Sequence, residues 1–265
     1  MSGETPGGLL RDAVRRDAAR PYLTHYDDAV GSRVELSYAT FDNWVAKTAN
    51  LLVDEFATDP GDDVVLALPA HWQTAAWLFA CWSAGLVAHP LPDDAAAVPA
   101  DPPPRIVAAD GARVEAALDA GADEVVALSL HPLGAPLEHC PSGAVDYATQ
   151  VRGHGDQFVT YTRIGPDAPA LVTDGHRFSG GDLAAAARAA AERFGLDATD
   201  RVYAQVSMST YDDIVDTLLA PMAAGASVVI GTNPGAATLD GRFSTERITA
   251  TIGRLTGSGP IRRLR

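Results

Sequence analysis

Two stretches of the chain carry apolar side chains at helical spacing. Residues 38–56 place Phe41, Trp44, Val45, Thr48, Leu51, Leu52 and Phe56 at intervals of three and four, which predicts an amphipathic helix that Ser37 is positioned to cap. Residues 72–84 are apolar almost throughout and predict a second helix. Its tryptophans, Trp72, Trp77 and Trp82, lie five residues apart and so spread around the helix, which predicts burial on several of its sides.

Short apolar runs between turn residues predict buried parallel strands, and Val64–Leu68 is the clearest of them. Further strands are expected at 86–89, 106–109, 125–130, 158–162, 170–173, 202–206 and 227–230. Helices are expected between and after them at 111–121, 183–194, 212–223 and 245–255. This alternation predicts an α/β fold with mostly parallel sheets and helices on both faces.

We divide the chain by sequence into a disordered leader (1–8), a first α/β lobe (9–200) and a partial second lobe (201–265). A Pro- and Ala-rich connector spans 92–104, and 131–156 is expected to be irregular. Strand Ser227–Ile230 and helix Thr245–Leu255 fall near the end of the sequence, so we expect them at a homo-oligomer or partner-protein interface.

The formal net charge of −14 argues against nucleic acid or an anionic membrane as a partner. Two cysteines, Cys81 and Cys140, indicate no disulfide framework. The sequence has no signal-peptide pattern and no apolar run long enough for a membrane span. We therefore expect a cytoplasmic protein without membrane insertion.

Residues 161–172 read Tyr-Thr-Arg-Ile-Gly-Pro-Asp-Ala-Pro-Ala-Leu-Val. This segment resembles, without a gap, the phosphate loop Tyr-Thr-Ser-Gly-Thr-Thr-Gly-x-Pro-Lys-Gly-Val of the adenylate-forming superfamily, which includes acyl-CoA synthetases, adenylation domains and luciferases. Tyr161, Thr162, Pro169 and Val172 match the loop. Flanking segments resemble the same family in the same order: 36–41, 60–64, 84–91, 194–202 and 218–226.

The resemblance implies the fold of the N-terminal subdomains of acyl-CoA synthetases without their C-terminal lid. It also shows where the loop departs from the family. Such a loop binds phosphate through backbone N–H groups and one cation, yet Ile164 and Asp167 stand at glycine positions and Ala170 stands at the lysine position. Lys47 is the lone lysine of the sequence. The resemblance therefore implies that adenylation activity is lost.

Few residues remain as candidates for chemistry. The degenerate loop offers Tyr161, Thr162, Gly165 and the following His176 as weak cofactor-binding residues, and no catalytic residue is expected. No metal site is expected either: His131, His139 and Cys140 fit no zinc spacing, and Asp212, Asp213 and Asp216 suit a helix N-terminus. Ser207–Tyr211 stands where many CoA ligases line the acyl pocket, and a simple turn is the other interpretation.

Two classes of function follow from these observations. The first is a non-catalytic homologue that binds a partner protein or a small ligand in a remnant cleft, with no cofactor. The alternative is a residual enzyme that resembles an acyl-CoA synthetase and whose missing groups are rebuilt or supplied by another chain. ATP, AMP or CoA would be ligands only under that alternative.

Overall fold

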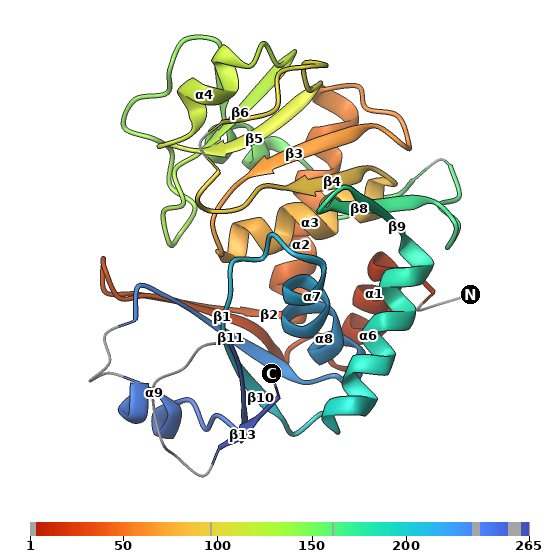
Figure 1. Ribbon diagram of the computed structural model, residues 1–265, viewed down its shortest axis with the longest axis vertical. Coiled ribbons are helices and arrows are strands. Elements are labelled where there is room, and N and C mark those ends of the chain that lie inside the picture. Colours follow the sequence, from red (N-terminus) through yellow and green to blue (C-terminus); the bar gives the residue numbers. More distant parts are fainter. Residues whose placement is uncertain (1–3, 96, 161, 235–238, 254–260, 265) are drawn as a thin grey trace.

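The computed structural model describes residues 4–95, 97–160, 162–234, 239–253 and 261–264, which form two β-sheets and the helices packed on them (Figure 1). The helices are α1 Pro6–Asp17, α2 Tyr38–Asn50, α3 Trp72–Ala84, α4 Val114–Asp119, α5 Tyr147–Gln150, α6 Gly180–Phe194, α7 Tyr211–Ile214, α8 Ala220–Ala224 and α9 Leu239–Thr245. Single π-helical turns at Leu51–Glu55 and Val215–Leu219 extend α2 and join α7 to α8, and a 3₁₀ turn, Val151–Gly153, follows α5.

The first sheet has the order β7-β6-β5-β3-β4-β8-β9 in the described residues, and only the last pair is antiparallel. Its strands are β3 Asp63–Ala67, β4 Val87–Pro90, β5 Ile106–Asp110, β6 Glu124–Leu128, β7 Ala144–Asp146, β8 Pro169–Thr173 and β9 His176–Ser179. Side chains alternate between its faces. Val64 and Leu66 of β3 pack into the main core, whereas Val65 and Ala67 pack on the other face with residues of α4. The predicted α/β class is confirmed.

The second sheet has the order β13-β12-β10-β11-β1-β2 in the same described ranges. Its strands are β1 Pro21–Asp27, β2 Ser32–Ser37, β10 Arg201–Gln205, β11 Ser227–Thr232, β12 Ala250–Gly253 and β13 Arg262–Arg263. Only the β1–β2 pair is antiparallel. Strand β11 lies between β10 and β1, so Ser227–Ile230 is not an edge of this sheet.

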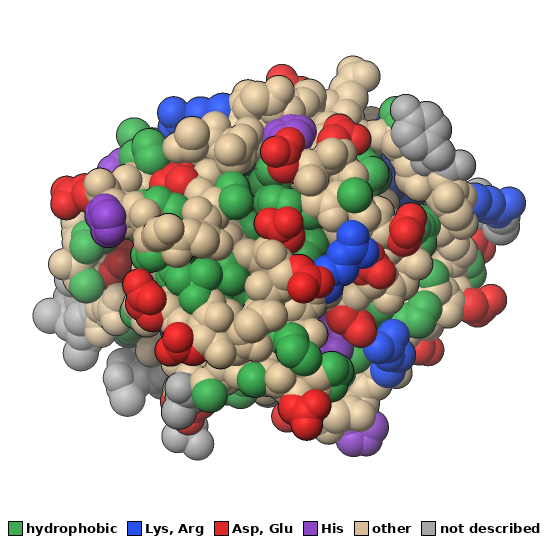
Figure 2. Space-filling view, turned by 90° about the horizontal axis from the view of Figure 1, so that it is seen from above, with side chains coloured by type: hydrophobic (Ala, Val, Ile, Leu, Met, Phe, Trp, Pro, Cys, Tyr) green, Lys and Arg blue, Asp and Glu red, His purple; other side chains and the backbone are tan. Residues whose placement is uncertain are grey.

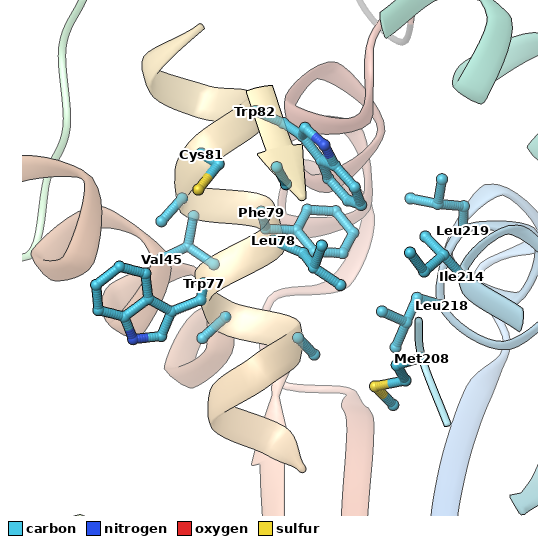
Figure 3. Packing of buried hydrophobic residues seen from close by; sticks show 14 of the residues in the cluster. Val45, Trp77, Leu78, Phe79, Cys81, Trp82, Met208, Ile214, Leu218 and Leu219 are labelled. Atoms are coloured by element: carbon cyan, nitrogen blue, oxygen red, sulfur yellow. The ribbon is translucent and has the colours of Figure 1, made fainter. Parts of the chain in front are cut away.

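The two sheets share one hydrophobic core. Figure 3 shows side chains of α3, including Phe79 and Trp82, facing Ile214, Leu218 and Leu219 of α7 and the π-helical turn after it, and all belong to one buried cluster. The division at residue 200 therefore does not separate the sheets, because β1 and β2 from the first part of the chain complete the sheet built by β10 to β13.

Helices α2 and α3 follow the sequence pattern closely. The Ser37 hydroxyl accepts a hydrogen bond from the Thr40 N–H at 3.1 Å, so the predicted cap is confirmed. Helix α3 ends at Gly85, whose φ of 79° is left-handed and suits glycine. Trp72, Trp77 and Trp82 are buried in the core, as predicted.

Four local predictions are wrong, one of them the irregular stretch at 131–156, which contains β7 and α5. The leader at 1–8 is not disordered where it is described, because α1 begins at Pro6 and the Thr5 hydroxyl caps the Gly8 N–H. The described residues of 158–162 form no strand. The helix expected at 245–255 is replaced by the end of α9 and by strand β12, whose buried residues pair with the central strand β10.

Candidate functional site

The position that carries lysine in the related loops lies inside a strand here. Ala170 belongs to β8 and is 5% exposed, and its carbonyl accepts a hydrogen bond from Trp82 Nε1 at 2.9 Å. The next residue, Leu171, is fully buried and pairs with Ala88 of β4. The end of the loop is therefore part of the core.

Ile164, at a glycine position of the related loops, covers the turn after α3. A Cβ atom added at Gly85 would lie 2.5 Å from Ile164 Cδ1, which measures how closely the isoleucine approaches this turn. Pro60 lies against the same turn. The Ile164 side chain therefore packs against the turn at Gly85, at a position where a phosphate loop has glycine and an unhindered main chain.

The amino end of α6 lies next to the loop, and its first N–H groups are bonded within the chain. Gly180 N donates to Ala168 O at 2.9 Å, and Gly181 N donates to Pro166 O at 2.7 Å. Asp182 N donates to the Ser179 hydroxyl at 3.1 Å, and the Asp182 carboxylate accepts from the Ser179 N–H at 2.9 Å. This capping box confirms the predicted capping by Ser179 and Asp182. Hydrogen bonds from the Ser179 backbone N–H and hydroxyl also lower the pKa of Asp182.

The predicted site residues do not converge. Tyr161 lies outside the described residues. Thr162 is exposed, and its N–H donates to the Thr160 hydroxyl at 3.1 Å. Gly165 accepts from Ala168 N at 3.2 Å and has no neighbour within 4 Å of a built Cβ. His176 is exposed at the far end of the β8–β9 hairpin, and its Nδ1 donates to the Asp174 carbonyl at 3.0 Å.

A cavity of about 410 Å³ lies elsewhere, where the carboxyl ends of parallel strands from both sheets meet. We call it the intersheet cleft. It is lined by His25, Asp27, Pro69, Ala70, His71, Asp93, Leu130, Gln205, Val206, Ser207, Gly231, Thr232 and Asn233. These residues end or follow β1, β3, β4, β6, β10 and β11. Carboxyl ends of strands are where open α/β sheets bind ligands, because the loops there are free to vary.

Two buried histidines from different sheets meet in this cleft. His25 of β1 is 2% exposed and His71, which caps α3, is 5% exposed. Their ring centroids are 4.4 Å apart with the planes at 71°. His71 Nδ1 accepts the Gln73 N–H at 3.1 Å, so a neutral His71 carries its proton on Nε2. His25 Nε2 lies 3.3 Å from the Thr232 hydroxyl, while its Nδ1 makes no hydrogen bond of good geometry among the described residues, although the Ala70 backbone lies close enough to raise the pKa of the ring.

Both imidazoles are neutral at pH 7. Burial lowers the pKa of His25 to about 4. Burial, and then the neighbouring His25, lower the pKa of His71 well below its ordinary value. The physical cause is that a charged ring loses its hydration in the core and that two charged rings would repel each other.

The end of β10 supplies Gln205, Val206 and the Ser207 hydroxyl to the wall of the cleft. Ser207 Oγ lies 2.8 Å from Ser209 Oγ and 3.1 Å from Asp213 Oδ2. The Thr210 hydroxyl caps α7 by accepting the Asp213 N–H at 3.2 Å. The segment 207–211 is thus a strand-to-helix turn, and one of its residues also lines the cleft.

Other candidates from the sequence have local structural roles. Asp216 is buried and pairs with Arg193 at 3.1 Å. Within the described ranges, no group of three or more His, Cys, Asp or Glu side chains could hold a metal ion. Among the described helices none is long and apolar enough to cross a membrane. Figure 2 shows acidic side chains spread over the face seen from above, with fewer basic ones among them.

Sequence reasoning missed His25 and His71. Both lie far apart in the chain, and only strand pairing and the packing of α3 bring them together. A weak signal existed, since polar residues directly follow the buried runs of β10 and β11, and His71 follows the apolar run of β3 after Pro69 and Ala70.

Comparison with known proteins agrees with this fold. Residues 10–101 match the AMP-binding enzyme family. The solved Mycobacterium tuberculosis fatty acyl CoA synthetase has a TM-score of 0.74 at 14% identity over 94% of this chain, and apo MatB from Rhodopseudomonas palustris has 0.74 at 19% identity over 96%. The chain spans 49% of each of these two proteins, about half their length.

A curated protein of Mycobacterium tuberculosis, the TIGR03089 family protein, is 45% identical over 248 residues, which are 93% of this chain and 97% of the relative. The expected resemblance to the N-terminal part of adenylate-forming enzymes is confirmed. The chain therefore belongs to the TIGR03089 family, and its fold is that of the N-terminal half of the acyl-CoA synthetases.

Proposed function

We propose that this chain binds a small ligand in the intersheet cleft and does not itself form acyl adenylates. The observation that carries the proposal is the amino end of α6. Its Gly180, Gly181 and Asp182 N–H groups are bonded to Ala168, Pro166 and Ser179. A phosphate at this end would meet the Asp182 carboxylate instead of free donors, and like charges repel.

The absence of a lysine from the loop supports the same proposal. Lysine is absent from the loop, and Lys47 is engaged elsewhere, with its Nζ 2.6 Å from the His154 carbonyl and 2.5 Å from Asp156 Oδ1. Adenylate formation develops negative charge on a carboxylate and an α-phosphate, and enzymes stabilise such charge with cations placed in advance. Ala170 offers none.

Carboxylate-dependent exchange of pyrophosphate into ATP tests the proposal. Purified protein is incubated with ATP, labelled pyrophosphate and a series of acids from acetate to long-chain fatty acids and benzoate. We expect no exchange above the enzyme-free rate. Exchange by the purified chain would refute the proposal and establish the alternative, a residual enzyme with rebuilt nucleotide contacts. Exchange that starts only when a second chain is added would assign the missing groups to that chain.

A loop-repair variant makes this test sharper. Ala170→Lys combined with Ile164→Gly and Asp167→Gly returns the cation and two of the glycines. We expect no exchange from it either, because catalysis needs several groups placed around the reacting atoms at once. Adenylate formed by the triple variant would mean that the rest of the active site is intact.

Binding of a partner protein or a second copy of the chain stays a prediction from the sequence. The interior position of β11 leaves no free strand edge at Ser227–Ile230 for such an interface. Light scattering at micromolar concentration decides between monomer and oligomer.

A further inference from the structure

A second hollow adjoins the intersheet cleft. It has a volume of about 740 Å³ and shares Asp27 and Leu130 with the cleft. Its wall includes the apolar residues Val30, Pro132, Pro136 and Leu137 and also polar ones, among them Ser32, His131 and Glu138. Val30 is 68% exposed. The second hollow therefore adds apolar surface beside the polar cleft, and Asp27 lines both.

Carboxylates dominate the charge of the polar compartment. Asp27 and Asp93 line it, and no lysine or arginine stands among the described residues that do so. Burial raises the pKa of Asp93, Arg113 opposes this, and Asp110, Asp94 and Asp213 add to the rise, so several carboxylates act at this place. The two histidines add no positive charge while they are neutral. A phosphate, a carboxylate or another anion would enter against this field.

Asp27 has room for a donor. Its Oδ1 accepts the Ala29 N–H and the Asn233 side-chain amide, each at 2.9 Å. Its Oδ2 makes no hydrogen bond among the described residues, and because Asp27 is only half-buried this oxygen is open to the cleft. Nearby, the buried Nδ1 of His25 makes no hydrogen bond of good geometry among the described residues, although the Ala70 backbone lies close enough to raise the pKa of the ring. A ligand that brings an N–H donor would find the Asp27 oxygen available to accept it.

We propose that the joined hollows bind a small amphipathic amine, with its ammonium group at Asp27 and its apolar body along the wall formed by Val30, Pro132 and Leu137. The inference rests on the proposed binding function and gives it a ligand class. It departs from the acid-activating relatives, because the charge at Asp27 and Asp93 selects a cation over an acid of the same size.

Hexylammonium and hexanoate test the proposal, since they share one body and carry opposite charges. Each is titrated into the full chain at pH 7 and low salt and followed by ¹H–¹⁵N NMR. We expect hexylammonium to saturate shifts of residues in both hollows at millimolar concentration, and hexanoate to bind at least about tenfold more weakly. Added salt is expected to weaken the binding of hexylammonium, because it screens the carboxylates.

Matched variants locate the two ends of the ligand. Asp27→Asn should weaken hexylammonium about tenfold or more, whereas Asp123→Asn, an exposed aspartate ahead of β6 and so at the opposite end of the strand, should leave its affinity unchanged. Val30→Ser should weaken hexylammonium while ethylammonium, which lacks the long body, keeps its affinity. Because Val30 is exposed, this substitution leaves the fold intact.

Equal or tighter binding of hexanoate would overturn the inference, as would an unchanged affinity in Asp27→Asn. Absence of any hexylammonium shift at 20 mM would overturn it as well. None of these outcomes bears on pyrophosphate exchange, so the proposed lack of adenylation is tested separately.

Discussion

Protonation of the histidine pair predicts a specific loss of stability in mild acid. His25 has a pKa of about 4 in the folded chain and an ordinary value of 6.5 when unfolded. The unfolded chain therefore binds more protons between these values, so the contribution of His25 to stability is complete above pH 6.5 and is lost as the pH falls toward 4. His71 acts in the same direction.

The magnitude follows from the two pKa values. The full difference corresponds to about 3 kcal/mol, and about 2 kcal/mol of it is lost between pH 7 and pH 5. Carboxylates such as Glu246, whose folded pKa is about 2, begin to contribute only below pH 5. The window from pH 7 to pH 5 therefore separates the histidines from Glu246.

Urea unfolding followed by tryptophan fluorescence measures this loss at pH 7, 6 and 5. His25→Asn removes one titrating ring, so we expect its stability to fall by about 2 kcal/mol less than that of the parent chain over this range. The exposed His176→Asn serves as the control and should keep the parental pH dependence. The reasoning is refuted if His25→Asn and the parent lose the same free energy, or if an NMR titration gives His25 a pKa near 6.5.

Three further outcomes are expected. Burial raises the pKa of Glu246, but hydrogen bonds from two arginines and a tyrosine outweigh it and lower the pKa to about 2. The stabilisation by Glu246 is therefore lost as the pH falls from 4.5 toward 2. Urea unfolding of Glu246→Gln should show less loss of stability below pH 5 than the parent chain. Gly231→Ala should destabilise the fold by about 3 kcal/mol in urea, because its Cβ would lie 1.9 Å from Tyr203 Oη, whereas Gly165→Ala, with no neighbour within 4 Å, should have little effect. Ala170→Lys should lower the stability by about 3 kcal/mol or more, because it puts an ammonium group at a position 5% exposed; an unchanged melting temperature would mean that the side chain reaches solvent.

The elements that could be predicted from the sequence are those whose burial and ends depend on residues close together in the chain. Helix α3 was predicted with the bounds it has, Trp72–Ala84, because a continuous apolar segment ends at a glycine that suits a left-handed cap. Residues 245–255 were misread because the pattern of Ile248, Thr251 and Ile252 allows a helix. The segment forms strand β12 because it pairs with the central strand β10, and nothing in the local sequence indicates that pairing.

The features of the candidate site also differ in whether local sequence determines them. The loss of phosphate-loop chemistry could be read directly, because it depends on the residue types at Ile164, Asp167 and Ala170. The intersheet cleft could not, because it depends on contacts between strands remote in the sequence. His25 reaches it through β1, which pairs with β11, and His71 reaches it through the cap of α3.

The pairing of β1 with β11 also sets an order of events during synthesis. His25 lies beside Ile230, about 200 positions further along the chain. At about 5–20 residues per second, a ribosome needs about 10–40 s to make the second strand after the first. During that interval the β1–β2 hairpin lacks its parallel neighbour, and an unpaired strand edge is open to chaperones and to other nascent chains. A nascent chain that ends before β11 therefore lacks one wall of the cleft. Binding of a ligand in the cleft would show that synthesis has passed this strand.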